Sequence, residues 1–158
     1  MPTYAENLIG SVTVGAGGSS SITFSSIPST YTDLVIKLSG RASVTNNDLF
    51  YISYNSSTSS FTARYLYGTG SATGSGTDTT LGGWMDEDDD TASTFGNAEI
   101  YIPNYAGSNY KSASIDSVSE HNGTNAEQAF LASLWSNTSA ITSITLTPGG
   151  GNFKQYST

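Results

Sequence analysis

Short runs in which apolar and polar side chains alternate recur along this chain, and clusters of turn-forming residues separate them. In TDLVIKLSGR, residues 32–41, apolar side chains stand at every second position. A period of two is that of a β-strand with one buried face. About ten such runs follow one another at spacings of roughly 8–12 residues, which is typical of a β-sandwich or jelly roll. The sequence therefore predicts an all-β fold, an antiparallel β-sandwich or jelly roll of about 8–10 strands.

Composition agrees with this prediction. Charged residues make up only 11% of the chain, and 10 tyrosines and 6 phenylalanines supply a core, so disorder is not expected. A chain of 158 residues is expected to form one domain, residues 1–158. The expected strands are residues 8–14, 22–24, 32–41, 49–54, 61–67, 92–103, 110–120, 126–135, 141–147 and 152–158.

The longest interruption between expected strands is residues 68–91. It begins as a Gly/Ser/Thr tract and ends in five adjacent acids, DEDDD, at residues 86–90. A loop of this length inside a compact domain is usually functional or mobile. We therefore expect a long Gly/Ser/Thr and acidic loop at 68–91.

Charge excludes several classes of partner. The net charge is −8, and Lys and Arg together number five. Binding of nucleic acid needs a basic surface that displaces counterions from phosphates, and anionic membranes need the same. Neither is expected as a partner. Cysteine is absent, so disulfides and thiolate metal sites are excluded, and no secretory signal or membrane-spanning segment is recognisable.

The acidic run contains one candidate cation site. Asp86, Asp88 and Asp90 have the D-x-D-x-D spacing of a calcium loop, in which alternate carboxylates converge on one hard cation. The sixth and twelfth positions of that pattern are Thr91 and Asn97, where a calcium loop has Gly and Glu. Adjacent carboxylates repel one another, so a solvated loop is the main expectation. We expect no metal and no other cofactor.

No catalytic residue is expected. His121 is the only histidine, it lies in a turn-like segment, and the nucleophile pattern G-x-S-x-G is absent. Glu99 and Asp116 lie within expected strands that a hairpin loop at residues 104–109 joins, and there they can share a polar sheet face. Paired carboxylates of a glycosidase have such spacings, but two acids on a solvated sheet often do as well. A hydrolase is the remote alternative to a protein that is not an enzyme.

Three aromatic residues are candidates for recognition. Trp84 lies in the long interruption, and Tyr105 and Tyr110 flank the expected hairpin loop. Aromatic rings beside amides and hydroxyls stack on sugars and anchor protein interfaces. The same rings can instead cap the ends of the sandwich.

One stretch resembles a known family. The residues FSSIPSTYTDLVIKLSGR, 24–41, are similar to the opening of small virion structural proteins of tailed bacteriophages, common in aquatic phage genomes. Further segments carry the same resemblance: YLYG at 65–68, GNAEIYIPNY at 96–105, ITLTP at 144–148 and FKQYST at 153–158. The resemblance spans nearly the whole chain and implies a component of the virion that is made in the host bacterial cytoplasm.

The resemblance implies a non-enzymatic structural protein, and we expect a capsid decoration, or cement, protein on the head surface. Its partners are then other phage structural proteins, first the major capsid protein, and a homo-oligomer, a trimer, is expected. Residues 68–90 and 104–109 are the candidate interaction loops. The alternative is a tail-fibre or receptor-binding head that recognises host glycans through Trp84, Tyr105 and Tyr110.

Overall fold

The structure, a computed structural model, describes residues 6–46, 48–80, 82–123 and 126–158, and these residues contain strands and no helix. The strands are β1 (Ile22–Phe24), β2 (Asp33–Gly40), β3 (Leu49–Tyr54), β4 (Phe61–Gly68), β5 (Thr73–Asp78), β6 (Gly82–Trp84), β7 (Gly96–Pro103), β8 (Lys111–Ser119), β9 (Glu127–Trp135) and β10 (Ile144–Pro148). No helix that could cross a membrane occurs in this part of the chain.

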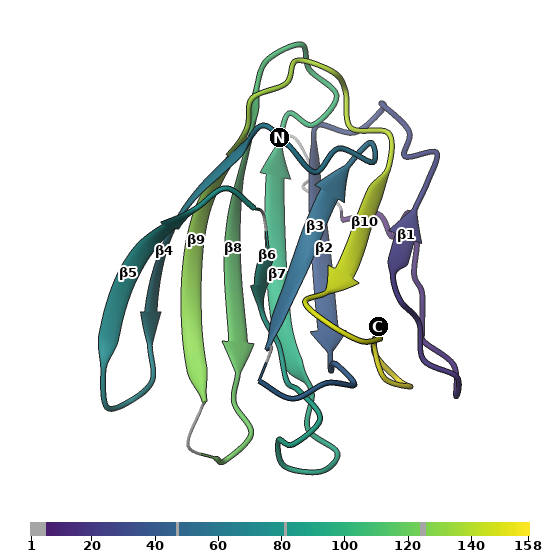
Figure 1. Ribbon diagram of the computed structural model, residues 1–158. Helices are drawn as coiled ribbons and strands as arrows, with labels where there is room; N and C mark the ends of the chain where they lie inside the picture. Colours follow the sequence, from purple (N-terminus) through teal and green to yellow (C-terminus); the bar gives the residue numbers. More distant parts are fainter. Residues whose placement is uncertain (1–5, 47, 81, 124–125) are drawn as a thin grey trace.

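The strands form two sheets that face each other (Figure 1). One sheet has four strands in the order β1-β10-β3-β6, and the other has six in the order β2-β7-β8-β9-β4-β5. Every neighbouring pair is antiparallel. The predicted antiparallel β-sandwich is confirmed.

The core forms where the alternating apolar residues of both sheets meet. On β7, for example, Ala98, Ile100 and Ile102 are buried while the residues between them are exposed. Burial of apolar side chains between two sheets is the main force that holds such a sandwich together. At one end of the core, Trp135 contacts the rings of Tyr54 and Phe61 at centroid distances of 5.6 Å and 6.1 Å.

The expected long loop at 68–91 is wrong, because β5 and β6 lie within it. β5 has the sequence TGSGTD, which contains no apolar side chain and so gives no period-two signal. Its two glycines fit the neighbouring strand: a Cβ atom at Gly74 would lie 2.6 Å from the ring of Tyr67, and one at Gly76 would overlap Tyr65. The glycines therefore let two tyrosine rings of β4 lie across β5.

The terminal runs at 8–14 and 152–158 were expected as strands and are irregular instead. They bind each other and the edge strand β2 through the backbone. Tyr156 N–H donates to Val14 O over 2.9 Å, and the N–H and C=O groups of Ser39 and Thr158 exchange hydrogen bonds of 2.7 Å and 2.9 Å. These contacts cover part of the β2 edge of the six-stranded sheet.

The two sheets differ in width, and this difference shapes one side of the molecule. β6 ends the four-stranded sheet and packs against β7, β8 and β9. In Figure 1, β4 and β5 lie at the left, beyond β6. There the rings of Tyr65 and Tyr67 of β4 contact the ring of Trp84 of β6.

Candidate functional site

The acidic segment 86–90 is folded into the protein rather than solvated throughout. Asp86 is fully buried, and the side chain of Asp90 is only 6% exposed. Within the run, Asp88 and Asp89 are the exposed residues. The expectation of a solvated loop is therefore wrong for three of the five acids in the run, Asp86, Glu87 and Asp90.

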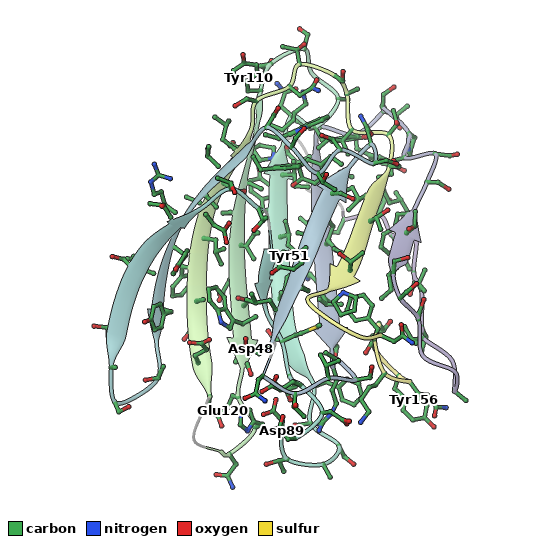
Figure 2. All side chains as sticks on the ribbon, viewed as in Figure 1. Asp48, Tyr51, Asp89, Tyr110, Glu120 and Tyr156 are labelled. Atoms are coloured by element: carbon green, nitrogen blue, oxygen red, sulfur yellow. The ribbon has the colours of Figure 1, made fainter. Side chains whose placement is uncertain are left out.

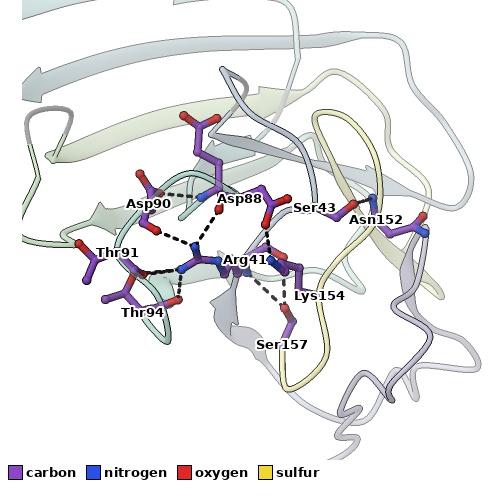
Figure 3. Close-up of polar contacts among 10 residues, drawn as sticks. Arg41, Ser43, Asp88, Asp90, Thr91, Thr94, Asn152, Lys154 and Ser157 are labelled. Carbon is purple, nitrogen blue, oxygen red and sulfur yellow. Dashed lines mark hydrogen bonds and ion pairs between the residues drawn. The ribbon is translucent and has the colours of Figure 1, made fainter.

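Arg41 is the reason the segment folds inward. It follows β2, is 5% exposed, and its guanidinium donates to the carbonyl oxygens of Asp88, Asp90, Thr91 and Thr94 over 2.8–3.2 Å (Figure 3). Five N–H donors in a fixed fork suit several acceptors at once. One buried cation thus shapes segment 88–94 through its backbone and leaves the carboxylates free for other contacts.

One of these carboxylates, that of Asp90, lies next to His121. The Nε2 atom of His121 is 3.0 Å from Oδ1 of Asp90, and both side chains are 6% exposed. His121 lies in the bend after β8, as its turn-like sequence predicts, and is a buried partner of the acidic segment. Burial raises the pKa of the Asp86 carboxyl group above its ordinary value.

The calcium-like spacing does not produce a calcium-like site. Asp88 is at the surface and pairs with Lys154, Asp90 contacts His121, and Asp86 is buried. Within the described ranges no three His, Cys, Asp or Glu side chains are arranged to hold a metal ion. The three aspartates thus have separate partners or environments.

A second pair of carboxyl groups joins the starts of β3 and β9. The side chains of Asp48 and Glu127 are hydrogen-bonded to each other. Burial, together with the charge of Asp48, raises the pKa of Glu127 to about 7, and burial also raises the pKa of Asp48. The indole of Trp84 hydrogen-bonds to Glu127; since Nε1–H is its only donor, the carboxyl group accepts. This pair therefore holds one edge of Trp84.

The other edge of Trp84 meets the tyrosines that lie over β5. Its ring centroid is 5.6 Å from that of Tyr65, at an interplanar angle of 64°, and 6.5 Å from that of Tyr67, at 28°. A cleft of about 120 Å³ opens beside these rings. Its lining includes Tyr51, Tyr65, Asp78, Thr80, Gly82 and Trp84. We call this space the aromatic cleft.

The structure does not bring the three predicted recognition residues together. Tyr105 is fully buried, and its hydroxyl donates to the carbonyl oxygen of Pro28. Tyr110 is 55% exposed, and Figure 2 shows it at the opposite end of the molecule from Asp48. Only Trp84 lines a cleft.

Glu99 and Asp116 do share a face, as the hairpin pattern predicts. They are directly opposite in the β7–β8 register, and both are exposed. Lys37 approaches Glu99 to 3.7 Å. Their open sheet face lacks the enclosure of a glycosidase site.

The sequence analysis did not identify Arg41 as the residue that binds the acidic segment. It also did not identify the residues that surround Trp84, which are Asp48, Glu127, Tyr65 and Tyr67. A weak signal existed for Glu127, an acid at the start of a strongly apolar run, and for Arg41, a cation directly after one. Arg41 meets its acceptors 47 to 53 positions away along the chain. Asp48 and Glu127 are 79 positions apart, and Tyr65 and Tyr67 meet Trp84 from another strand, so local patterns do not identify these partners.

An apolar patch lies on the outer face of the six-stranded sheet. Leu66 and Phe130 are opposite each other in the β4–β9 register and are 61% and 52% exposed. An open hollow of about 690 Å³ lies beside them and reaches Thr73 and Ser75 of β5. β5 is also the last strand on its side of the sheet. We call these residues and the free β5 edge the outer-face patch.

No protein-family model, curated protein or solved structure matches this chain.

Proposed function

We propose that this protein is a non-enzymatic structural component of a phage virion, and that it decorates the head by binding the major capsid protein. The sequence resemblance supports a virion component. The observation that carries the binding role is the outer-face patch, where exposed Leu66 and Phe130 adjoin a free strand edge.

The β5 edge has the properties of a pairing surface. Its six residues carry one charge, at Asp78, and contain neither lysine nor proline, the residues that usually protect an edge strand. An extended segment of a capsid subunit can add to such an edge through backbone hydrogen bonds. An apolar side chain of that segment then packs on Leu66 and Phe130, which removes their exposed area from water.

The order of the strands supports the same proposal at the level of the fold. The chain passes from one sheet to the other in the sequence β1, β2, β3, β4–β5, β6, β7–β9, β10. We interpret this winding as a jelly roll in which the β7–β8–β9 meander takes the place of one strand. Viral capsid domains and lectins use jelly rolls, although a fold alone does not specify a function.

In this role the protein stiffens the capsid by bridging neighbouring subunits, and a trimer suits a local three-fold axis of the head. The net charge of −8 keeps many copies at high local concentration from associating nonspecifically.

The copy number per particle tests the proposal. Quantitative mass spectrometry of purified virions is expected to find hundreds of copies, in a fixed ratio to the major capsid protein. A few copies would instead place the protein on the tail and favour the alternative, a receptor-binding head that recognises host glycans. Absence from the particle would contradict both.

A binding assay tests the surface. Purified protein is added to particles that lack it, and bound protein is separated by sedimentation. The double variant Leu66→Ser and Phe130→Ser is expected to lose binding, whereas Tyr110→Ser, an exposed aromatic at the far end, is expected to keep it. If Tyr110→Ser loses binding and the double variant keeps it, the interface lies at the 104–109 hairpin instead.

A further inference from the structure

We infer that the aromatic cleft is a binding site for a methylated ammonium group, such as the head of choline or the side chain of trimethyl-lysine. The cleft lies at β6, Tyr51 and Tyr65, whereas the outer-face patch lies at Leu66 and Phe130 on the other side of β4. The inference therefore does not depend on the proposed function.

The walls of the cleft have the chemistry that such a cation needs. Tyr51, Tyr65 and Trp84 all line it, and Trp84 meets Tyr65 at 64°, so that two ring planes form a corner. Aromatic rings attract cations through the negative potential of their faces, and angled rings surround a quaternary ammonium group in known cages. A volume of about 120 Å³ suits a group of this small size.

The rim adds a negative charge. Asp78 lines the cleft, and its Oδ1 atom accepts hydrogen bonds from the N–H groups of Thr79 and Thr80 over 2.6 Å and 2.9 Å. These bonds hold the carboxylate in one orientation. Together with the net charge of −8, the rim makes the site complementary to a cation and unfavourable to an anion.

The principal ring is fixed before any ligand arrives. Trp84 donates its indole N–H to Glu127, while Tyr67 lies over its ring at a centroid distance of 6.5 Å. Gly74 and Gly76 admit the two tyrosine rings against β5. A site built from side chains already held in place loses less conformational entropy on binding.

Tryptophan fluorescence provides the test, because the chain has only two tryptophans and Trp135 is buried in the core. Choline chloride is titrated at constant ionic strength. We expect a saturable change in the emission of Trp84, with a dissociation constant of roughly 1–10 mM. The neutral isostere 3,3-dimethylbutan-1-ol, which has carbon in place of nitrogen, is expected to bind at least tenfold more weakly, about 1.4 kcal/mol.

Variants locate the binding. Asp78→Asn keeps the acceptor for Thr79 and Thr80 and removes the charge, so choline is expected to bind roughly threefold more weakly. Tyr65→Leu is expected to weaken binding roughly tenfold. Tyr110→Leu, far from the cleft, is the matched control and is expected to bind as the unmodified protein does.

Two further probes, phosphocholine and a trimethyl-lysine peptide, distinguish a choline headgroup from a methylated lysine as the natural source of the ammonium group. Stronger binding of the peptide is expected, since the phosphate of phosphocholine is repelled by Asp78. Equal binding of choline and its neutral isostere would overturn the inference, as would no saturable change with choline. Saturable binding of methyl glucoside in its place would assign the cleft to a neutral sugar instead.

Discussion

Replacement of Glu127 by glutamine is expected to stabilise the protein at pH 8 and to leave its stability nearly unchanged at pH 4. Glu127 shares a hydrogen bond with Asp48 and accepts one from Trp84. A glutamine side chain keeps both contacts, because its amide donates to Asp48 and its carbonyl accepts from the indole. The substitution therefore removes an ionisation and little else.

The sign follows from the proton balance. The pKa of Glu127 rises from 4.5 to about 7 on folding, so between these values the folded chain binds more protons than the unfolded chain. The free energy of unfolding consequently falls as the pH rises through this window. The loss is fully developed above pH 7 and is absent below pH 4.5.

The magnitude follows from the same shift. A rise in pKa from 4.5 to about 7 corresponds to at most about 3 kcal/mol. Glu127 is only partly buried, and solvent screens its interaction with Asp48, so we expect about 1–2 kcal/mol. The two carboxyl groups titrate as a pair, and the variant also relieves Asp48 of a neighbouring negative charge.

Urea unfolding at pH 4 and pH 8, followed by tryptophan fluorescence, measures the effect. Glu99→Gln is the matched control, because Glu99 is an exposed strand residue whose contact with Lys37 contributes less than about 0.5 kcal/mol. If Glu127→Gln changes stability equally at both pH values, or destabilises at pH 8, the proton shared with Asp48 is not the cause and the reasoning fails.

Three further predictions concern the buried cations and the acidic segment. Arg41→Met is expected to lower the free energy of unfolding by about 3–5 kcal/mol, because four carbonyl oxygens lose their donor; urea unfolding measures this, and unchanged stability would show that the segment folds without Arg41. Lys111→Met is expected to cost about 2–3 kcal/mol in the same assay, since the Nζ of this 1% exposed lysine donates to the carbonyls of Gly107 and Asn109; a smaller loss would mean that the 104–109 hairpin does not need it. Millimolar calcium is expected to leave the melting temperature unchanged, and a rise would show that the aspartates of segment 86–90 can converge after all, because a ligand of the folded state must stabilise it.

The local pattern of the sequence was sufficient wherever a strand has one buried face. The runs expected at 22–24, 32–41, 49–54 and 61–67 correspond to β1–β4, and those expected at 92–103, 110–120, 126–135 and 141–147 correspond to β7–β10. β5 was not predicted, because its sequence TGSGTD contains no apolar side chain and therefore shows no alternation. Its two glycines instead make room for the tyrosine rings of the neighbouring strand β4. The terminal runs alternate but pair only through scattered backbone contacts.

For the candidate site, the sequence identified segments that take part in it, but it did not predict which of their side chains are buried and which are exposed. Trp84 and the acidic run stood out by composition, yet Asp86 is buried while Asp88 is exposed, and nothing in DEDDD distinguishes them. Tyr105 and Tyr110 flank one hairpin, but one is in the core and the other is at the surface.

The sequence by itself determined an all-β sandwich, the positions of most strands and a strongly acidic surface, because side-chain alternation and charge are local properties. Only the tertiary structure decided which acids of segment 86–90 are buried, that Arg41 binds the backbone of this segment, and that Trp84 stands between a carboxyl pair and two tyrosines. Periodicity shows which side chains leave the same face of a strand, whereas strand order and sheet packing decide which distant side chains they meet.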